Sequence, residues 1–168
     1  NSIFIIGIHV DDATLATNDE ELRKEVIAKL EDQFLVKDLG DLSHYLGMRV
    51  TKTGDVTEIT QDGYVEKMVA RFKMDMANPV DTPGVAGQIL TKDDCPEIGT
   101  IEQEEMKTKP FRSLVGSMMY AYIGTRPDIG STLVKVAAFC NNPGLPHWVA
   151  AKRILRYLKG TKQDPIQY

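Results

Sequence analysis

Short apolar runs separated by polar turns open the chain. Residues 3–10 form a nearly continuous apolar run rich in β-branched residues, which predicts a strand buried on both faces. Asp11 and Asp12 end this run, and residues 13–16 can return as the partner strand. The pattern therefore predicts a tight hairpin with two adjacent carboxylates at its turn.

A helix and a second hairpin are predicted next. Asn18 is expected to cap a helix over residues 18–34, because Glu21 stands where a capping box prefers it and apolar residues recur at every fourth position. Residues 45–51 and 56–60 predict two short strands on either side of a Gly-containing turn.

The hydrophobic period becomes helical after residue 61. A helix is predicted from residue 62 to about Met76. Residues 77–109 hold three of the eight prolines and two acidic runs, which indicates a long, exposed and partly mobile connection.

Residues 110–168 predict three helices. Pro110 suits a first helical turn, Asp128 is placed to cap the second helix, and Trp148 falls on the buried edge of the third. Together these patterns predict an α+β protein. Its predicted segments are residues 1–60, 61–109 and 110–168.

The net charge of −4 conceals an asymmetry along the chain. The same three segments carry formal charges of −6, −4 and +6. An acidic front and a basic tail suggest cation handling at one end and an anionic partner at the other, although a chance distribution of surface charge gives the same values. Cys95 and Cys140 stand alone and are expected to be reduced thiols in an intracellular protein. The start at Asn1, with neither an initiator Met nor a signal peptide, suggests a fragment.

The Asp11–Asp12 pair is the first candidate for chemistry. Neighbouring carboxylates repel each other, and a bound divalent cation such as Mg²⁺ removes that conflict. Taken alone, however, the pair more often marks a simple polar turn.

Four segments, in order, resemble the reverse transcriptase of copia-type LTR retrotransposon polyproteins. Residues 8–12 are similar to its YVDD box, with His9 where the family usually has Tyr. Residues 36–48 resemble the segment KDLGxLxxFLG, residues 125–129 match TRPDI, and residues 147–161 match HW…KRILRYLKGT.

The resemblance implies a partial polymerase palm followed by an all-helical, thumb-like bundle. Asp11 and Asp12 would be catalytic carboxylates that hold Mg²⁺. The primer-grip hairpin would fall at Tyr45, Leu46, Gly47 and Met48. A basic face would follow the RNA or DNA template–primer duplex through Lys152, Arg153, Arg156 and Lys159, which as residues of an amphipathic helix could equally be a solvated face.

The family's other catalytic Asp and its fingers lie upstream, and no residue of this sequence stands for them. We therefore expect the chain alone to be inactive as an RNA-directed DNA polymerase, with weak or absent Mg²⁺ binding, while template–primer binding is retained. The alternatives are an exapted protein-interaction module or effector without polymerase activity, and a relic with no selected role. The predicted location is the cytoplasm or nucleus, with secretion left open for an effector, and no membrane partner is expected.

Other singled-out residues have structural interpretations. Met68, Met118 and Met119 are expected in the core. Arg126 and Asp128 are expected to interact at a helix start. His44 and His147 are expected to be surface or capping residues.

Overall fold

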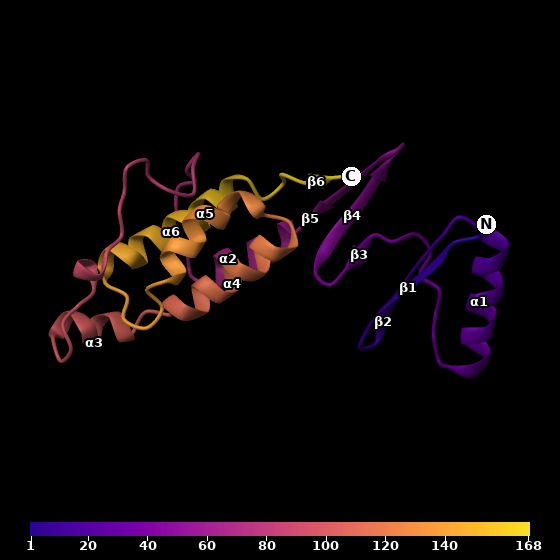
Figure 1. The fold of residues 1–168 in the computed structure, drawn as a ribbon, viewed down its shortest axis with the longest axis horizontal. Coiled ribbons are helices and arrows are strands. Elements are labelled where there is room, and N and C mark those ends of the chain that lie inside the picture. The colour runs from indigo at the N-terminus through magenta and orange to yellow at the C-terminus, as the bar shows by residue number, and fades with distance from the viewer. The chain divides into compact units, whose positions relative to one another are not determined.

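Helices and strands gather into two units, Asn1–Tyr45 and Leu46–Tyr168, in the computed structural model, which describes all 168 residues (Figure 1). Two small antiparallel sheets combined with six α-helices confirm the predicted α+β class. The boundary between the two units, after Tyr45, differs from the predicted boundaries after residues 60 and 109. The three predicted segments therefore stay a prediction about the protein's domains.

The first unit is a hairpin followed by one helix. Strand β1 (Phe4–His9) pairs antiparallel with β2 (Asp12–Thr17), and helix α1 (Glu20–Gln33) follows. The hairpin and the helix lie where the sequence predicted them. The register runs from Phe4 opposite Thr17 to His9 opposite Asp12.

The cap of α1 differs from the prediction. Asp19 is the N-cap, and its Oδ1 accepts the backbone N–H of Leu22 at 3.1 Å. Asn18 instead accepts the backbone N–H of Ile3 at 2.7 Å. The predicted cap at Asn18 is therefore wrong, because its side chain fastens the start of the hairpin.

Strand β1 is also more exposed than predicted. Ile5 and Ile8, on opposite faces of the strand, are 62% and 72% exposed. Two strands and one helix provide too few layers to cover both faces of a sheet. The prediction of a strand buried on both faces is wrong for this reason.

The second unit begins with a small sheet. Strands β4 (Met48–Thr53) and β5 (Val56–Thr60) form an antiparallel hairpin, and β6 (Ile166–Gln167) pairs with β5. The predicted strand over 45–51 is interrupted: β3 (His44–Tyr45) ends before Leu46 and Gly47, whose φ angles of 49° and 73° form a tight turn.

Four helices form the main core. They are α2 (Asp62–Arg71), α4 (Phe111–Gly124), α5 (Gly130–Ala137) and α6 (Leu145–Gly160), with the short helix η2 (Pro127–Ile129) before α5. Met68 and Met118 are buried between them and Met119 packs against them, as predicted. Helix α2 ends earlier than predicted, because Lys73 takes a left-handed φ of 55°.

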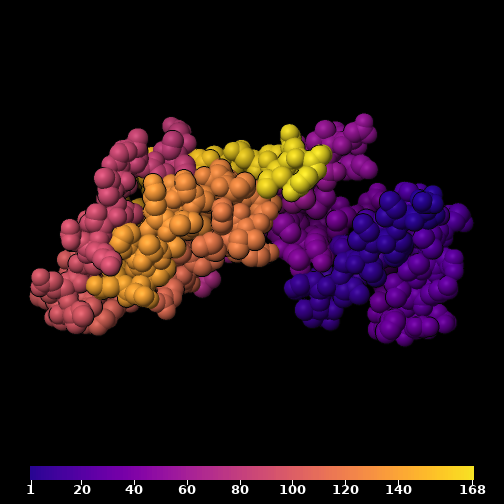
Figure 2. All heavy atoms as spheres, in the orientation of Figure 1, coloured from indigo at the N-terminus to yellow at the C-terminus, as the bar shows by residue number.

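The segment between α2 and α4 packs on these helices. It contains η1 (Lys92–Asp94) and α3 (Ile101–Lys107), whose Met106 is buried. Figure 2 shows this segment, in magenta and rose, lying against the orange and yellow atoms of the helices. The prediction of an exposed connection holds for most residues of 77–109, of which only Pro96 and Met106 are buried. The segment is nevertheless attached to the helices, since Leu90 packs against the core and Asn142 donates to the Pro96 carbonyl at 2.8 Å.

Two further observations concern the helices and the two cysteines. None of the helices combines the length and apolar composition that a membrane crossing needs. Cys95 and Cys140 are free thiols.

Candidate functional site

The Asp11–Asp12 pair lies at the tip of the first hairpin. Val10 and Asp11 form its two-residue turn, and Asp12 opens β2 opposite His9. Val10 has a φ of 53°, a left-handed conformation that is uncommon for a β-branched residue and costs on the order of 1–3 kcal/mol. The strained turn presents both carboxylates to solvent.

These two carboxylates do not form a complete metal site. The chain contains no group of three or more His, Cys, Asp or Glu side chains that could hold a metal ion. Mg²⁺ requires six oxygen ligands in near-octahedral geometry, so two adjacent carboxylates leave most positions to water or to phosphates. The pair fits a contribution to a Mg²⁺ site, and no catalytic step can be derived from it alone.

Of the predicted primer-grip residues, Tyr45 ends the first unit, whereas Leu46, Gly47 and Met48 open the second unit, with the turn at Leu46 and Gly47. Tyr120 on α4 donates its hydroxyl to the Leu46 carbonyl at 2.5 Å. The Tyr120 ring meets Tyr64 edge-on, with ring centroids 4.9 Å apart. The turn is therefore anchored to α2 and α4, which gives its backbone a fixed position in this unit.

The four predicted nucleic-acid-binding residues all lie on α6 and are half-buried. Arg153 donates to the hydroxyl of Thr82 at 2.9 Å, and Arg156 donates from Nε to the Asn78 carbonyl at 2.6 Å. Lys159 donates to the carbonyls of Asp75 and Ala77.

Lys152 makes no hydrogen bond of this kind, but its ammonium lies 5.6 Å from the centroid of the Trp148 ring. Trp148 itself is half-buried against the core, so its predicted place on a buried edge is confirmed in part.

The charge of this basic face is not neutralised by carboxylates. None of the four residues takes part in a salt bridge. Their hydrogen-bond partners are neutral carbonyl and hydroxyl oxygens, which fix the side chains without cancelling their charge. Such a face can attract anions, and it also ties α6 to residues 75–82.

A buried arginine joins two of the resembling segments. Arg126, 4% exposed, donates Nε and Nη2 to the two carboxylate oxygens of Asp128 at 3.0 and 2.7 Å. It also donates to the carbonyl and hydroxyl of Thr161, at 2.8 and 2.6 Å. The predicted Arg–Asp interaction is confirmed, whereas sequence spacing gave no signal for Thr161.

Asp128 does not cap the following helix, contrary to the prediction. Ile129 is the N-cap of α5 and makes no side-chain cap. Burial alone would raise the pKa of Asp128, but hydrogen bonds from Arg126 and Tyr157 hold that pKa below its usual value. The carboxylate therefore stays ionised as the partner of Arg126.

His147 is buried, which the sequence did not indicate. Its Nδ1 accepts the backbone N–H of Gly144 at 2.9 Å, confirming a capping role at the start of α6. The imidazole stacks on Phe139 with ring centroids 3.9 Å apart, and its Nε2 has no partner. Burial lowers the pKa of His147, against the opposing charge of Asp94. His44, in contrast, is exposed as predicted.

Comparison with known proteins gives the family. The model of the reverse transcriptase (RNA-dependent DNA polymerase) family matches residues 1–86. The Retrovirus-related Pol polyprotein from transposon TNT 1-94 of Nicotiana tabacum is 40% identical over 98% of the chain, and that from transposon RE2 of Arabidopsis thaliana is 32% identical over 98%. The chain spans only 12% and 11% of these two relatives.

A different kind of relative matches a shorter stretch. The secreted RxLR effector protein 161 of Plasmopara viticola is 38% identical over 63 residues, which are 38% of the chain and 44% of that protein. No solved structure matches the chain. The family match, covering about half of the chain, and the long copia-type matches agree with the four resembling segments. The chain belongs to the reverse transcriptase family, as part of a copia-type retrotransposon polyprotein.

Proposed function

We propose that the helices of residues 110–168 act as a thumb, which binds the template–primer duplex through its phosphates. The observation that carries this proposal is the basic face of α6, formed by Lys152, Arg153, Arg156 and Lys159, with no carboxylate partner. In the polymerase to which this segment contributes, Asp11 and Asp12 supply two carboxylates toward Mg²⁺. Residues 45–48 support the primer end.

Phosphate binding by such a face depends on salt rather than on sequence. Each neutralised phosphate releases condensed counterions, so the logarithm of the affinity falls by about 0.9 per phosphate for each unit of log salt on duplex DNA. Four cations predict a slope of about −3 to −4, and a loss of affinity of roughly 150-fold between 50 and 200 mM salt. The acidic residues of the first unit oppose binding only within about 10 Å at these ionic strengths.

The test is a fluorescence-anisotropy titration of the full chain with a 20-base-pair duplex at several salt concentrations. Lys152→Gln removes one charge without breaking a bond to residues 75–82, and we expect it to reduce the slope by about 0.9. Lys67→Gln on α2, an exposed lysine, is the matched control and should leave the slope unchanged. A folded chain that binds no duplex at 20 mM salt would refute the thumb proposal.

The second candidate is an exapted protein-interaction module or effector. The observation that favours it is the match to a protein named as a secreted effector. This candidate takes first place if the folded chain does not bind a duplex. In that case the basic face serves only to hold residues 75–82 on α6.

A further inference from the structure

A pocket of about 520 Å³ lies beside the basic face, between α6 and residues 74–88. Three cations line it, Lys152, Arg153 and Arg156, together with the amide side chains of Asn78 and Gln88. No acidic side chain lines it; Asp75 and Asp81, on the same loop, are not part of its wall. A pocket with this set of side chains favours an anion that also accepts hydrogen bonds.

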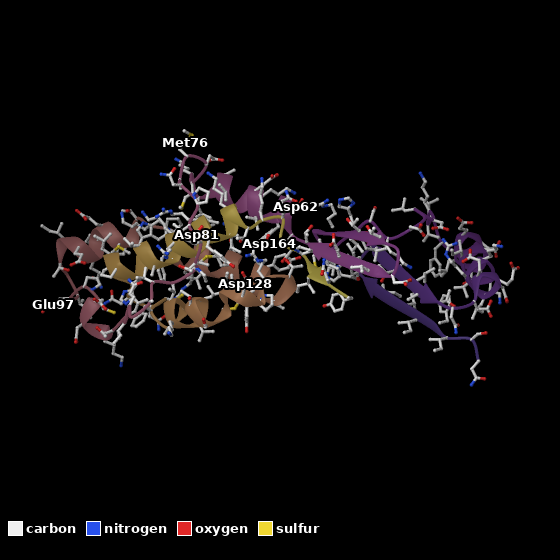
Figure 3. All side chains as sticks on the ribbon, turned by 90° about the horizontal axis from the view of Figure 1, so that it is seen from above. Asp62, Met76, Asp81, Glu97, Asp128 and Asp164 are labelled. Carbon is white, nitrogen blue, oxygen red and sulfur yellow. The ribbon has the colours of Figure 1, made fainter.

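The rest of the lining is apolar, and part of it is accessible. Met76 is 94% exposed and stands at the outer edge of the second unit in Figure 3, and Val85 and Val149 are each about half exposed. Met74 lines the same pocket but is buried, at 8% exposure. Apolar side chains beside uncompensated cations fit a ligand with one flat, apolar part and one anionic part.

The two guanidinium groups are held in place before any ligand arrives. Arg156 uses Nε for the Asn78 carbonyl, and Arg153 uses Nη2 for Thr82, so each keeps further N–H donors. The buried Nε of Arg153 has no partner at all. That atom is closed to solvent, so a phosphate oxygen can accept only from the remaining N–H donors of the two guanidinium groups. It can do so without reorienting the side chains, which favours binding.

We propose that this pocket binds a single nucleotide unit, with its phosphate on Lys152, Arg153 and Arg156 and its base against Met74 and Met76. The volume lies within the range of about 300–1,000 Å³ that small-molecule sites occupy. The choice of a nucleotide rests on the proposed nucleic-acid binding, whereas the anion site rests on the pocket alone. The ligand is either a free nucleotide or the unpaired end of a strand, since both present the same chemistry.

The test is isothermal titration of the full chain with adenosine monophosphate, inorganic phosphate and adenosine. We expect the monophosphate to bind about tenfold more tightly than phosphate, and adenosine to bind more weakly than the monophosphate. Lys152→Met should weaken both anions about tenfold, while the exposed Lys67→Met should not. Met76→Ser should weaken the monophosphate about threefold and leave phosphate unchanged.

Several results would overturn the proposal, provided that circular dichroism shows a folded chain. The first is that the monophosphate does not bind at 10 mM. The second is that phosphate or adenosine binds as tightly as the monophosphate. The third is that Lys152→Met and Lys67→Met have equal effects on binding. Binding of a 5′-phosphorylated single-stranded octamer with the same sensitivity to Lys152→Met assigns the pocket to a strand end. Binding of the monophosphate without the octamer assigns it to a free nucleotide.

The duplex titration separates this proposal from the thumb function. Duplex binding without monophosphate binding removes the pocket proposal and leaves the thumb. Monophosphate binding without duplex binding removes the thumb and leaves the pocket.

Discussion

Replacing Arg126 by Met should destabilise the second unit strongly. The side chain is 4% exposed and makes four hydrogen bonds, two to Asp128 and two to Thr161. Removing one partner of a buried ion pair costs about 3–5 kcal/mol. Because the Asp128 side chain is 37% exposed and water can reach it, we expect about 2–4 kcal/mol for Arg126→Met.

Denaturant unfolding followed by tryptophan fluorescence measures this loss in the second unit, because Trp148 is the only tryptophan of the chain. The control is Arg112→Met, which removes an exposed arginine bonded to Asn141 at 2.9 Å and should cost less than about 1 kcal/mol. A double-mutant cycle with Asp128→Asn should give a coupling free energy of about 1–2 kcal/mol. A loss below 1 kcal/mol for Arg126→Met would refute the role of Arg126 in joining residues 125–129 to the C-terminal end of α6.

Three further predictions concern the start of α6 and the first hairpin. Because burial lowers the folded-state pKa of His147, the unfolded chain binds the proton more readily. The contribution of neutral His147 to the free energy of unfolding is therefore complete above its ordinary pKa of 6.5 and declines as the pH falls toward the folded pKa. In His147→Asn, the free energy of unfolding measured from pH 7.5 to 5 should lose this decline. Gly144→Ala should destabilise the second unit by about 1–3 kcal/mol in denaturant unfolding, because its Cβ would lie 1.8 Å from the Asp94 carbonyl oxygen; a smaller loss would mean that this backbone contact relaxes freely. Mn²⁺ should broaden the backbone amide signals of residues 10–13 at millimolar concentrations, and Asp11→Asn should reduce this broadening; broadening centred elsewhere would count against the carboxylate pair as a metal ligand.

Local patterns predicted most of the elements, since spacing and turn residues decide them. The hairpin turn at Asp11 and the buried Met118 of α4 are of this kind. The cap of α1 was misassigned because Asn18 and Asp19 are both good cap residues, and the choice depends on the contact of Asn18 with Ile3 across the hairpin. Burial of β1 was overestimated because an apolar run does not reveal how many layers cover it.

The candidate site was less predictable because its contacts join distant segments. The sequence placed four cations on one helix but did not indicate that Arg156 bonds to Asn78, a residue 78 positions away. The segment 77–109 was expected to be exposed from its prolines and acidic residues, and those features do not report the packing of Met106. The family resemblance gave the candidate residues, while the pocket followed only from the fold.

Photo-cross-linking of the full chain to a duplex tests the central claim, that the α6 basic face binds the template–primer backbone. Cross-linked peptides identified by mass spectrometry should map to residues 145–160 and to the adjoining residues 74–88, and 500 mM salt should abolish them, because binding through four phosphates is screened at that ionic strength. Lys152→Gln should lower the yield, while Lys67→Gln should not. Cross-links that gather on α1 or α3, or that persist unchanged at high salt, would contradict the account.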